Sequence, residues 1–173
     1  KRVAIRGFFD SKAELAQALA LQVGGPAYDS LQETLDDKQI DAVSVCVANA
    51  AHAEVRIAAL RAGKHVLCEK PMAVTLEECE AMVAEARRAD RILMIGHNQR
   101  FDPAHIRGRQ MIAAGRIGRP LSFRSIFGHP GPDAWVGDAN PWFFSRERAS
   151  FGALADLGIH KTDILHYLLD EPI

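Results

Sequence analysis

The sequence lacks most of the features that mark a specialised environment. Its three cysteines are odd in number and show no C-x-x-C spacing, which argues against a disulfide framework and against a zinc site. The formal net charge of −1 leaves no electrostatic footprint for nucleic acid or for an anionic membrane. No run approaches the roughly 20 apolar residues of a membrane span, and no segment resembles a signal peptide. These absences predict a cytoplasmic protein without a metal centre and without nucleic-acid or membrane partners.

What is present is typical of a globular α/β domain. The 173 residues are 48% hydrophobic and 25% charged, which suffices for one good core or two small ones. Short apolar runs at 40–47 and 64–68 are typical of buried parallel strands covered on both faces. Between them, residues 53–62 have helix-forming composition and end at Gly63, a common residue just after a helix. This order predicts a β-α-β unit.

A second unit of the same kind follows. A helix is expected over 75–89, where Thr75 and Glu78 fit the capping-box pattern, and a strand over 91–95. Another helix is expected over 13–23. Alternating strands and helices predict a doubly wound parallel sheet of Rossmann type, whose ligands lie at the carboxyl ends of the strands.

The texture of the sequence changes beyond Gly96. A helix is expected from Pro103 to about residue 115, then a strand over 121–127. Residues 128–150 form a long segment rich in glycine, proline and aromatics, and so much aromatic surface is expected to pack rather than to be disordered. We therefore divide the chain into a dinucleotide-binding domain at 1–98 and the beginning of an α+β substrate and oligomerisation domain at 99–173.

Two segments carry most of the chemical information. Asp156, His160 and Asp163 stand at offsets of zero, four and seven, which stacks them on one face of a helix. A carboxylate one turn before an imidazole can orient the ring and raise its basicity, as proton transfer requires. In the second segment, an apolar strand runs directly into Glu69, Lys70 and a proline. Both patterns are typical of an active site.

Three motifs together resemble one family. They are AGKHVLCEKP at 62–71, GHNQRFDP at 96–103 and FGALADLGIHKTDILHYLL at 151–169. Their residues and their order are similar to those of the glucose-fructose oxidoreductase / inositol dehydrogenase (Gfo/Idh/MocA) family of NAD(P)-dependent oxidoreductases. The resemblance extends from about Asp10 to the end of the chain.

The resemblance implies roles for individual residues. Lys70 would be the active-site lysine next to the substrate hydroxyl and the nicotinamide. The Lys70–Pro71 bond that follows it is often cis in the family. Asp156 and His160 would complete the catalytic set, with His160 as the general base or acid. The residues implied on the cofactor side are Gly7, Asp10, Asn49, Glu69 and Lys70. The residues expected to contact substrate are His97, His129 and Trp142, whereas Arg100 is expected in an interdomain ion pair and Asp163 as a structural hydrogen-bonding partner.

One departure concerns the cofactor site. A dinucleotide needs a strand, a G-x-G-x-x-G turn and a helix N-terminus to hold its pyrophosphate, and the glycine turn is missing here. Either residues 1–7 are the first strand and Phe8 already belongs to the second, or residues 1–10 are wholly the second strand. In both cases Asp10 is the candidate acid for the adenosine ribose and favours NAD over NADP, although Arg6 or Lys12 could reverse this preference. These features predict a fragment of a longer enzyme.

The resemblance implies hydride transfer between a secondary alcohol of a sugar, cyclitol or sugar derivative and NAD or NADP. Two alternatives stay open. One is NAD-dependent, redox-assisted glycoside cleavage at the same site, and the other is a ligand-sensing regulatory protein of the same fold. Family members commonly assemble through the second domain, so a homodimer or homotetramer is expected.

Overall fold

The computed structural model describes residues 3–131, 142–149 and 152–170. The strands are β1 (Ala42–Val45), β2 (His65–Cys68) and β3 (Leu93–Ile95). The α-helices are α1 (Ala13–Val23), α2 (Leu31–Asp36), α3 (His52–Arg61), α4 (Leu76–Ala89), α5 (Pro103–Ala113), α7 (Arg146–Ala149) and α8 (Ile159–Leu169). Short 3-10 turns are η1 (Asn49–Ala51), η2 (Asn98–Phe101) and η3 (Trp142–Phe144), and η4 (Leu154–Gly158) is a π turn that leads into α8.

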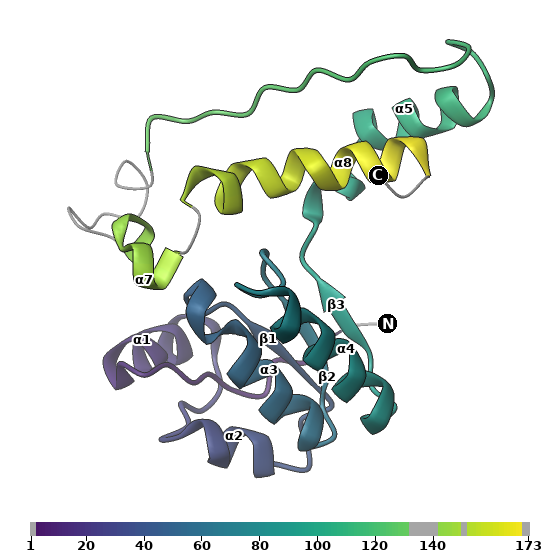
Figure 1. The fold of residues 1–173 in the computed structure, drawn as a ribbon. Helices are drawn as coiled ribbons and strands as arrows, with labels where there is room; N and C mark the ends of the chain where they lie inside the picture. Colours follow the sequence, from purple (N-terminus) through teal and green to yellow (C-terminus); the bar gives the residue numbers. More distant parts are fainter. Residues whose placement is uncertain (1–2, 132–141, 150–151, 171–173) are drawn as a thin grey trace.

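The three strands form one parallel sheet in the order β1-β2-β3. Val45 pairs with Cys68 and Cys68 with Ile95, so the three strands end at the same edge. Parallel neighbours require a crossover, and α3 and α4 provide the two crossovers (Figure 1). The predicted α/β, Rossmann-type parallel architecture is confirmed.

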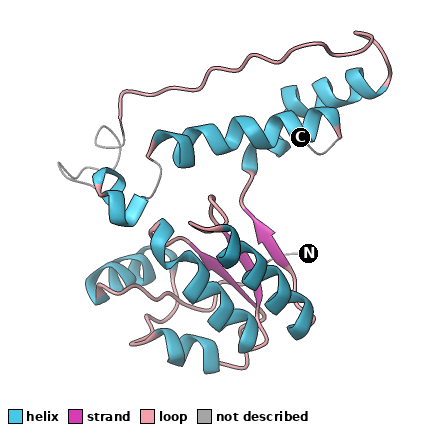
Figure 2. Ribbon diagram, viewed as in Figure 1, coloured by secondary structure: helices cyan, strands magenta, loops and turns pink. Residues whose placement is uncertain are grey.

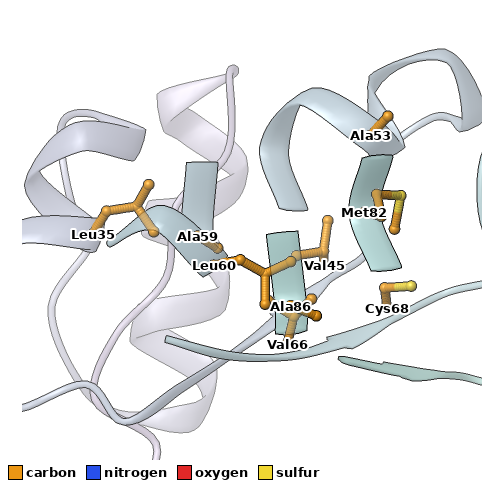
Figure 3. Packing of buried hydrophobic residues seen from close by; sticks show 9 residues of the cluster. All are labelled: Leu35, Val45, Ala53, Ala59, Leu60, Val66, Cys68, Met82 and Ala86. Atoms are coloured by element: carbon orange, nitrogen blue, oxygen red, sulfur yellow. The ribbon is translucent and has the colours of Figure 1, made fainter. Parts of the chain in front are cut away.

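The hydrophobic core lies between this sheet and the two crossover helices. Val45, Val66 and Cys68 point inward from the strands, and Leu60 of α3 and Met82 of α4 meet them (Figure 3). Leu60 and Met82 are both 0% exposed. Helix α4 begins with the predicted capping box, since the Thr75 hydroxyl accepts the Glu78 N–H and the Glu78 carboxylate accepts the Thr75 N–H.

The opposite face of the sheet is open in the described structure. Leu67 and Met94 point away from the core and are each 44% exposed. The prediction that both faces of the strands are covered therefore holds for one face only. Uninterrupted apolar runs predict strands that are buried on both faces. Among the described residues, only the inward-facing side chains of each strand pack against helices.

The N-terminal segment is less regular than predicted. Residues 3–7 form no strand, and Val3 is 92% exposed. Phe8 makes a single parallel bridge to Ala27, supported by hydrogen bonds from Phe8 N to the Pro26 carbonyl and from Tyr28 N to the Phe8 carbonyl. A strand exists only where a neighbour accepts its hydrogen bonds, and here that neighbour is limited to the residues around Ala27.

The predicted strand at 121–127 is also absent. This segment runs in an extended path past α8, seen as the long pink trace in Figure 2, without a strand partner among the described residues. Leu121 and Ile126 are 90% and 80% exposed. The apolar alternation is present in the sequence, but alternation alone does not make a strand without a second strand beside it.

The C-terminal region is built on two helices that lie side by side, α5 and α8 (Figure 1). The predicted helix over 103–115 is confirmed as α5, which Asp102 caps by accepting the Ala104 N–H at 2.7 Å. The aromatic segment at 128–150 lies partly outside the described residues, but Trp142 and Phe143 stack with ring centroids 4.0 Å apart. No helix in the described parts of the chain is long and apolar enough to span a bilayer.

The core packing gives a first prediction. Leu60→Ala removes a fully buried side chain and should lower the free energy of unfolding by about 2–5 kcal/mol. Leu67→Ala on the open face is the matched control and should cost clearly less, because its side chain is 44% exposed. Urea denaturation monitored by circular dichroism measures both, and equal losses would contradict this description of the core.

Candidate active site

The carboxyl edge of the sheet supplies the first half of the site. Strand β2 ends at Cys68 and continues into Glu69, Lys70 and Pro71, and the Lys70–Pro71 peptide bond is cis, as expected. Strand β1 ends beside it and leads through Val47 to the 3-10 turn η1. The two strand ends therefore lie next to each other, in the usual position for a ligand site of a parallel α/β sheet.

The second half comes from the π turn η4. The Lys70 ammonium donates to the backbone carbonyl of Asp156 at 2.9 Å and also to its carboxylate oxygen Oδ1. Both side chains are largely buried, with 16% and 19% exposed. The attraction between opposite charges is stronger at such a site than in open water. This ion pair joins the sheet to the C-terminal helix segment.

His129 approaches the other oxygen of the same carboxylate. Its Nδ1 accepts the Gly131 N–H at 3.1 Å, so a neutral ring carries its proton on Nε2. That Nε2 lies 3.8 Å from Asp156 Oδ2. The Asp156 carboxylate thus has Lys70 on one oxygen and His129 near the other.

His160 lies in the first turn of α8 and is 9% exposed. Its Nδ1 is buried and has no hydrogen-bond partner among the described residues. Burial lowers the pKa of His160, and the positive charge of Lys70 lowers it further. A neutral imidazole with an unused ring nitrogen can accept a proton, which is the property required of a general base.

The helical spacing predicted a different partner for Asp156. Four residues before an imidazole on an α-helix, a carboxylate faces the ring, but residues 154–158 form a π turn, whose wider register changes which side chains face each other. The carboxylate of Asp156 is directed to Lys70 instead. The edge of the Phe127 ring contacts His160, with ring centroids 5.8 Å apart.

A second cluster anchors this helix. Asp163 accepts three hydrogen bonds from Arg100, two from Nε at 2.8 and 3.1 Å and one from Nη2. Its Oδ1 also lies 3.7 Å from His97 Nε2. Arg100 thus forms the expected ion pair, but both partners belong to the predicted second domain, so the pair is not interdomain. Asp163 has the expected structural role, and His97 has a buried Nδ1 without a partner among the described residues.

A cavity of about 300 Å³ adjoins the Lys70–Asp156 pair. Asn49 also lines it, and its side-chain amide donates to the Ala149 carbonyl at 2.9 Å, which fixes α7 beside the sheet. The residues around the cavity are Cys46, Val47, Asn49, Glu69, Lys70, Pro71, Trp142, Phe143 and Asp156. Five of the residues singled out from the sequence therefore share one cavity wall, and they come from four separate segments.

The remaining two predicted cofactor residues lie elsewhere. Neither Gly7 nor Asp10 lines this cavity. A Cβ atom on Gly7 would lie 2.5 Å from the Tyr28 ring, so this glycine allows close packing against Tyr28. Asp10 is exposed, and its carboxylate accepts the Lys12 N–H at 2.9 Å just before α1. These positions are occupied by protein contacts.

These contacts test how a nicotinamide dinucleotide would fit. At the substrate end, Lys70 lines the cavity, and His160 lies close enough for the Lys70 charge to lower its pKa. At the pyrophosphate end, the described residues provide no glycine turn. The described residues therefore offer groups for the nicotinamide end of the cofactor and no cradle for its pyrophosphate.

Two contributors were missed from the sequence. His52 and Arg56 of α3 are 1% and 0% exposed, and both bond to backbone carbonyls at the strand ends. Neither residue is among the site residues predicted from the sequence, and Arg56 carries no recognisable signal there. The sequence offers one clue to its role. An arginine on the inner face of a crossover helix would be buried, and a buried charge requires hydrogen-bonding partners.

Among residues 3–131, 142–149 and 152–170, no group of three or more histidine, cysteine, aspartate or glutamate side chains is arranged to hold a metal ion. The three cysteines carry no disulfide, and Cys68 is buried.

Comparison with known proteins agrees with this fold. The model of the "oxidoreductase family, NAD-binding Rossmann fold" (Gfo/Idh/MocA) matches residues 1–97, and the model of the Gfo/Idh/MocA C-terminal domain matches residues 105–173. The fold defines a Rossmann-type α/β protein. Within that class, the chain belongs to the Gfo/Idh/MocA oxidoreductase family.

Similar proteins include named sugar and cyclitol enzymes. A 1,5-anhydro-D-fructose reductase of Ensifer adhaerens is 40% identical over 93% of this chain and 47% of its own length. A myo-inositol 2-dehydrogenase of Thermotoga maritima is 32% identical over 95% and 46%. The structure of a levoglucosan dehydrogenase in complex with NADH and levoglucosan has a TM-score of 0.81 at 33% identity, covering 96% of this chain and 45% of that one. The chain thus spans about half the length of these relatives.

The surroundings of His160 give a second prediction. Its pKa in the folded protein should lie below the usual value of about 6.5, and Lys70→Met should raise it, because the variant removes a positive charge and leaves the Asp156 carboxylate. Proton NMR titration of the His160 ring measures both values.

The same shift affects stability. Below about pH 6.5 the unfolded chain takes up a proton that the folded site resists, so the free energy of unfolding should fall as the pH falls through this range. A titration midpoint at or above 6.5 in the folded protein would contradict the role of burial.

Proposed function

We propose that the protein is an oxidoreductase that transfers hydride between a secondary alcohol of a sugar, cyclitol or sugar derivative and NAD or NADP. The observation that supports it best is the Lys70–Asp156 pair beside a buried His160 with an unused ring nitrogen. The names of the relatives support the substrate class, because they refer to an anhydro-sugar, a levoglucosan and an inositol enzyme.

Each of the three residues has a distinct task in this proposal. His160, kept neutral by burial, accepts the hydroxyl proton. Lys70 stabilises the developing alkoxide with its positive charge and orients the hydroxyl. Asp156 holds the Lys70 ammonium in place, and with His129 near its second oxygen it offers a polar contact to a neighbouring hydroxyl. When bound, the nicotinamide supplies the hydride chemistry.

Three further residues are proposed to determine which alcohol is accepted. Trp142 lines the cavity, and its aromatic ring suits the apolar face of a sugar ring. His129, near Asp156, and His97, near Asp163, do not line this cavity and are proposed as additional polar contacts around it. Asn49 and Glu69 line the same cavity and are proposed on the cofactor side.

We further propose a cytoplasmic, homo-oligomeric protein. The described cysteines are free, which is typical of a reducing compartment. The extended segment at 121–127 exposes apolar side chains that would gain from burial in an assembly. Gel filtration with light scattering and fractionation of cells would test both statements.

The catalytic assignment gives a third prediction. Lys70→Met and His160→Asn should each lower the turnover rate by about 10²–10⁴-fold, because each removes a charge or a proton acceptor from the reacting hydroxyl. NADH formation with myo-inositol or levoglucosan, and NADH consumption with 1,5-anhydro-D-fructose, measure the rate.

The controls separate chemistry from folding. Lys38→Met removes an exposed lysine that does not line the cavity and should retain full turnover. Cofactor binding, followed by fluorescence, should be unchanged in His160→Asn and Lys38→Met. Turnover that survives in both Lys70→Met and His160→Asn would refute the assignment.

A further inference from the structure

Helix α3 carries two polar side chains that are fully buried against residues 69–72, the turn that carries Lys70. His52 is 1% exposed and Arg56 is 0% exposed, whereas the other buried residues of this helix, Ala53, Ala59 and Leu60, are apolar and belong to the core. Enclosing such groups is costly unless their hydrogen bonds are satisfied, so their partners reveal what they do.

The partners of Arg56 lie on both sides of the catalytic lysine. One terminal nitrogen, Nη2, donates to the Glu69 carbonyl at 2.8 Å, and the other, Nη1, donates to the Met72 carbonyl. The planar guanidinium thus bridges the residue before Lys70 and the residue after Pro71. Because the fork of an arginine is rigid, it fixes the spacing of these two carbonyls.

His52 links this turn to the neighbouring strand end. Its Nδ1 lies 2.7 Å from the Pro71 carbonyl, and its Nε2 lies 2.9 Å from the Val47 carbonyl. Both carbonyls belong to residues that line the cavity. His52 therefore lies between a carbonyl that follows β1 and one that follows β2.

The two residues contribute unequally. A neutral imidazole has one N–H and can donate to only one of the two carbonyls, and burial together with Arg56 lowers the pKa of His52. Burial also lowers the pKa of Arg56, to about 10, which leaves the guanidinium charged at neutral pH. Arg56 is thus the permanent restraint, and His52 adds a single donor.

We propose that Arg56, assisted by His52, is a positioning residue that holds the Glu69–Met72 turn so that the Lys70 ammonium meets Asp156. This inference rests on the proposed function for its catalytic meaning. Neither side chain touches Lys70 or the cavity directly, so both act through the backbone on which Lys70 is carried.

A purely structural role would predict a different pattern of contacts. The buried Lys64, for comparison, donates to the Asp37 and Ile40 carbonyls, which do not line the cavity. The side-chain nitrogens of Arg56 and His52 instead lie within hydrogen-bond distance of four carbonyls, and three of these belong to residues lining the cavity (Val47, Glu69 and Pro71).

The test follows the Lys70 ammonium itself. The full chain is labelled with carbon-13 at the ε position of its lysines, and the Lys70 signal is assigned with Lys70→Arg. Asp156→Asn removes the negative charge from this contact and defines the shift of a Lys70 that has lost its ion pair. Arg56→Met is expected to move the Lys70 signal to that same position. Arg61→Met is the matched control on the same helix, because Arg61 is exposed and pairs with Glu85. In this variant the Lys70 signal should stay at its wild-type position.

Two milder variants cover the case in which Arg56→Met does not fold. Arg56→Lys keeps a buried cation without the planar fork, and His52→Gln keeps one donor. Both should give Lys70 signals between those of the wild type and Asp156→Asn. A wild-type Lys70 signal in the folded Arg56 variants would overturn the inference, even if their melting temperatures fall.

Turnover separates this inference from the proposed function. If the wild type oxidises a polyol, Arg56→Lys should lower kcat by up to about 10²-fold while KM changes little, because a misplaced catalytic group mainly affects the chemical step. Full kcat in folded Arg56→Lys would overturn the positioning role and leave the function intact. A wild type without turnover would refute the proposed function, and the Lys70 signal would still decide whether Arg56 sets its position.

Discussion

The ion pair between Lys70 and Asp156 is the contact on which the candidate site depends. The two residues are 86 positions apart in the chain; Lys70 follows the end of β2, and Asp156 lies in a π turn. Because both are largely buried, breaking the pair would leave a charge without a partner where water cannot easily replace it. The pair therefore both joins two regions of the chain and places a cation beside the cavity.

Much of the fold could be predicted because its elements are locally encoded. The capping box at Thr75 and the glycine after α3 mark helix ends through short-range hydrogen bonds, and the structure has both. Gly63 has a φ of +79°, which explains why the helix ends there. The site could be located for a related reason, since parallel strands bring their carboxyl ends together whatever lies between them. The roles of the individual site residues stay predictions.

The features that could not be predicted depend on distant partners. Whether 121–127 pairs as a strand depends on a second segment beside it, and no local pattern contains that information. The same holds for Arg56, whose carbonyl partners become neighbours only after the turn around Pro71 has formed. Asp156 was expected to face His160 because an α-helical register was assumed, whereas the π turn directs it to Lys70.

That π turn also fixes the rotational phase of the whole helix. Asp156, which pairs with Lys70, lies within this turn, and Asp163, which is held by Arg100, lies further along the helix. In an α-helix each residue advances the direction of the side chains by about 100°. A deletion of residue 157 or 158, between the two aspartates, would therefore turn Asp156 away from Lys70 while Asp163 stays anchored. In this segment chain length is constrained more strongly than composition, so insertions and deletions should be tolerated less than substitutions of its apolar residues.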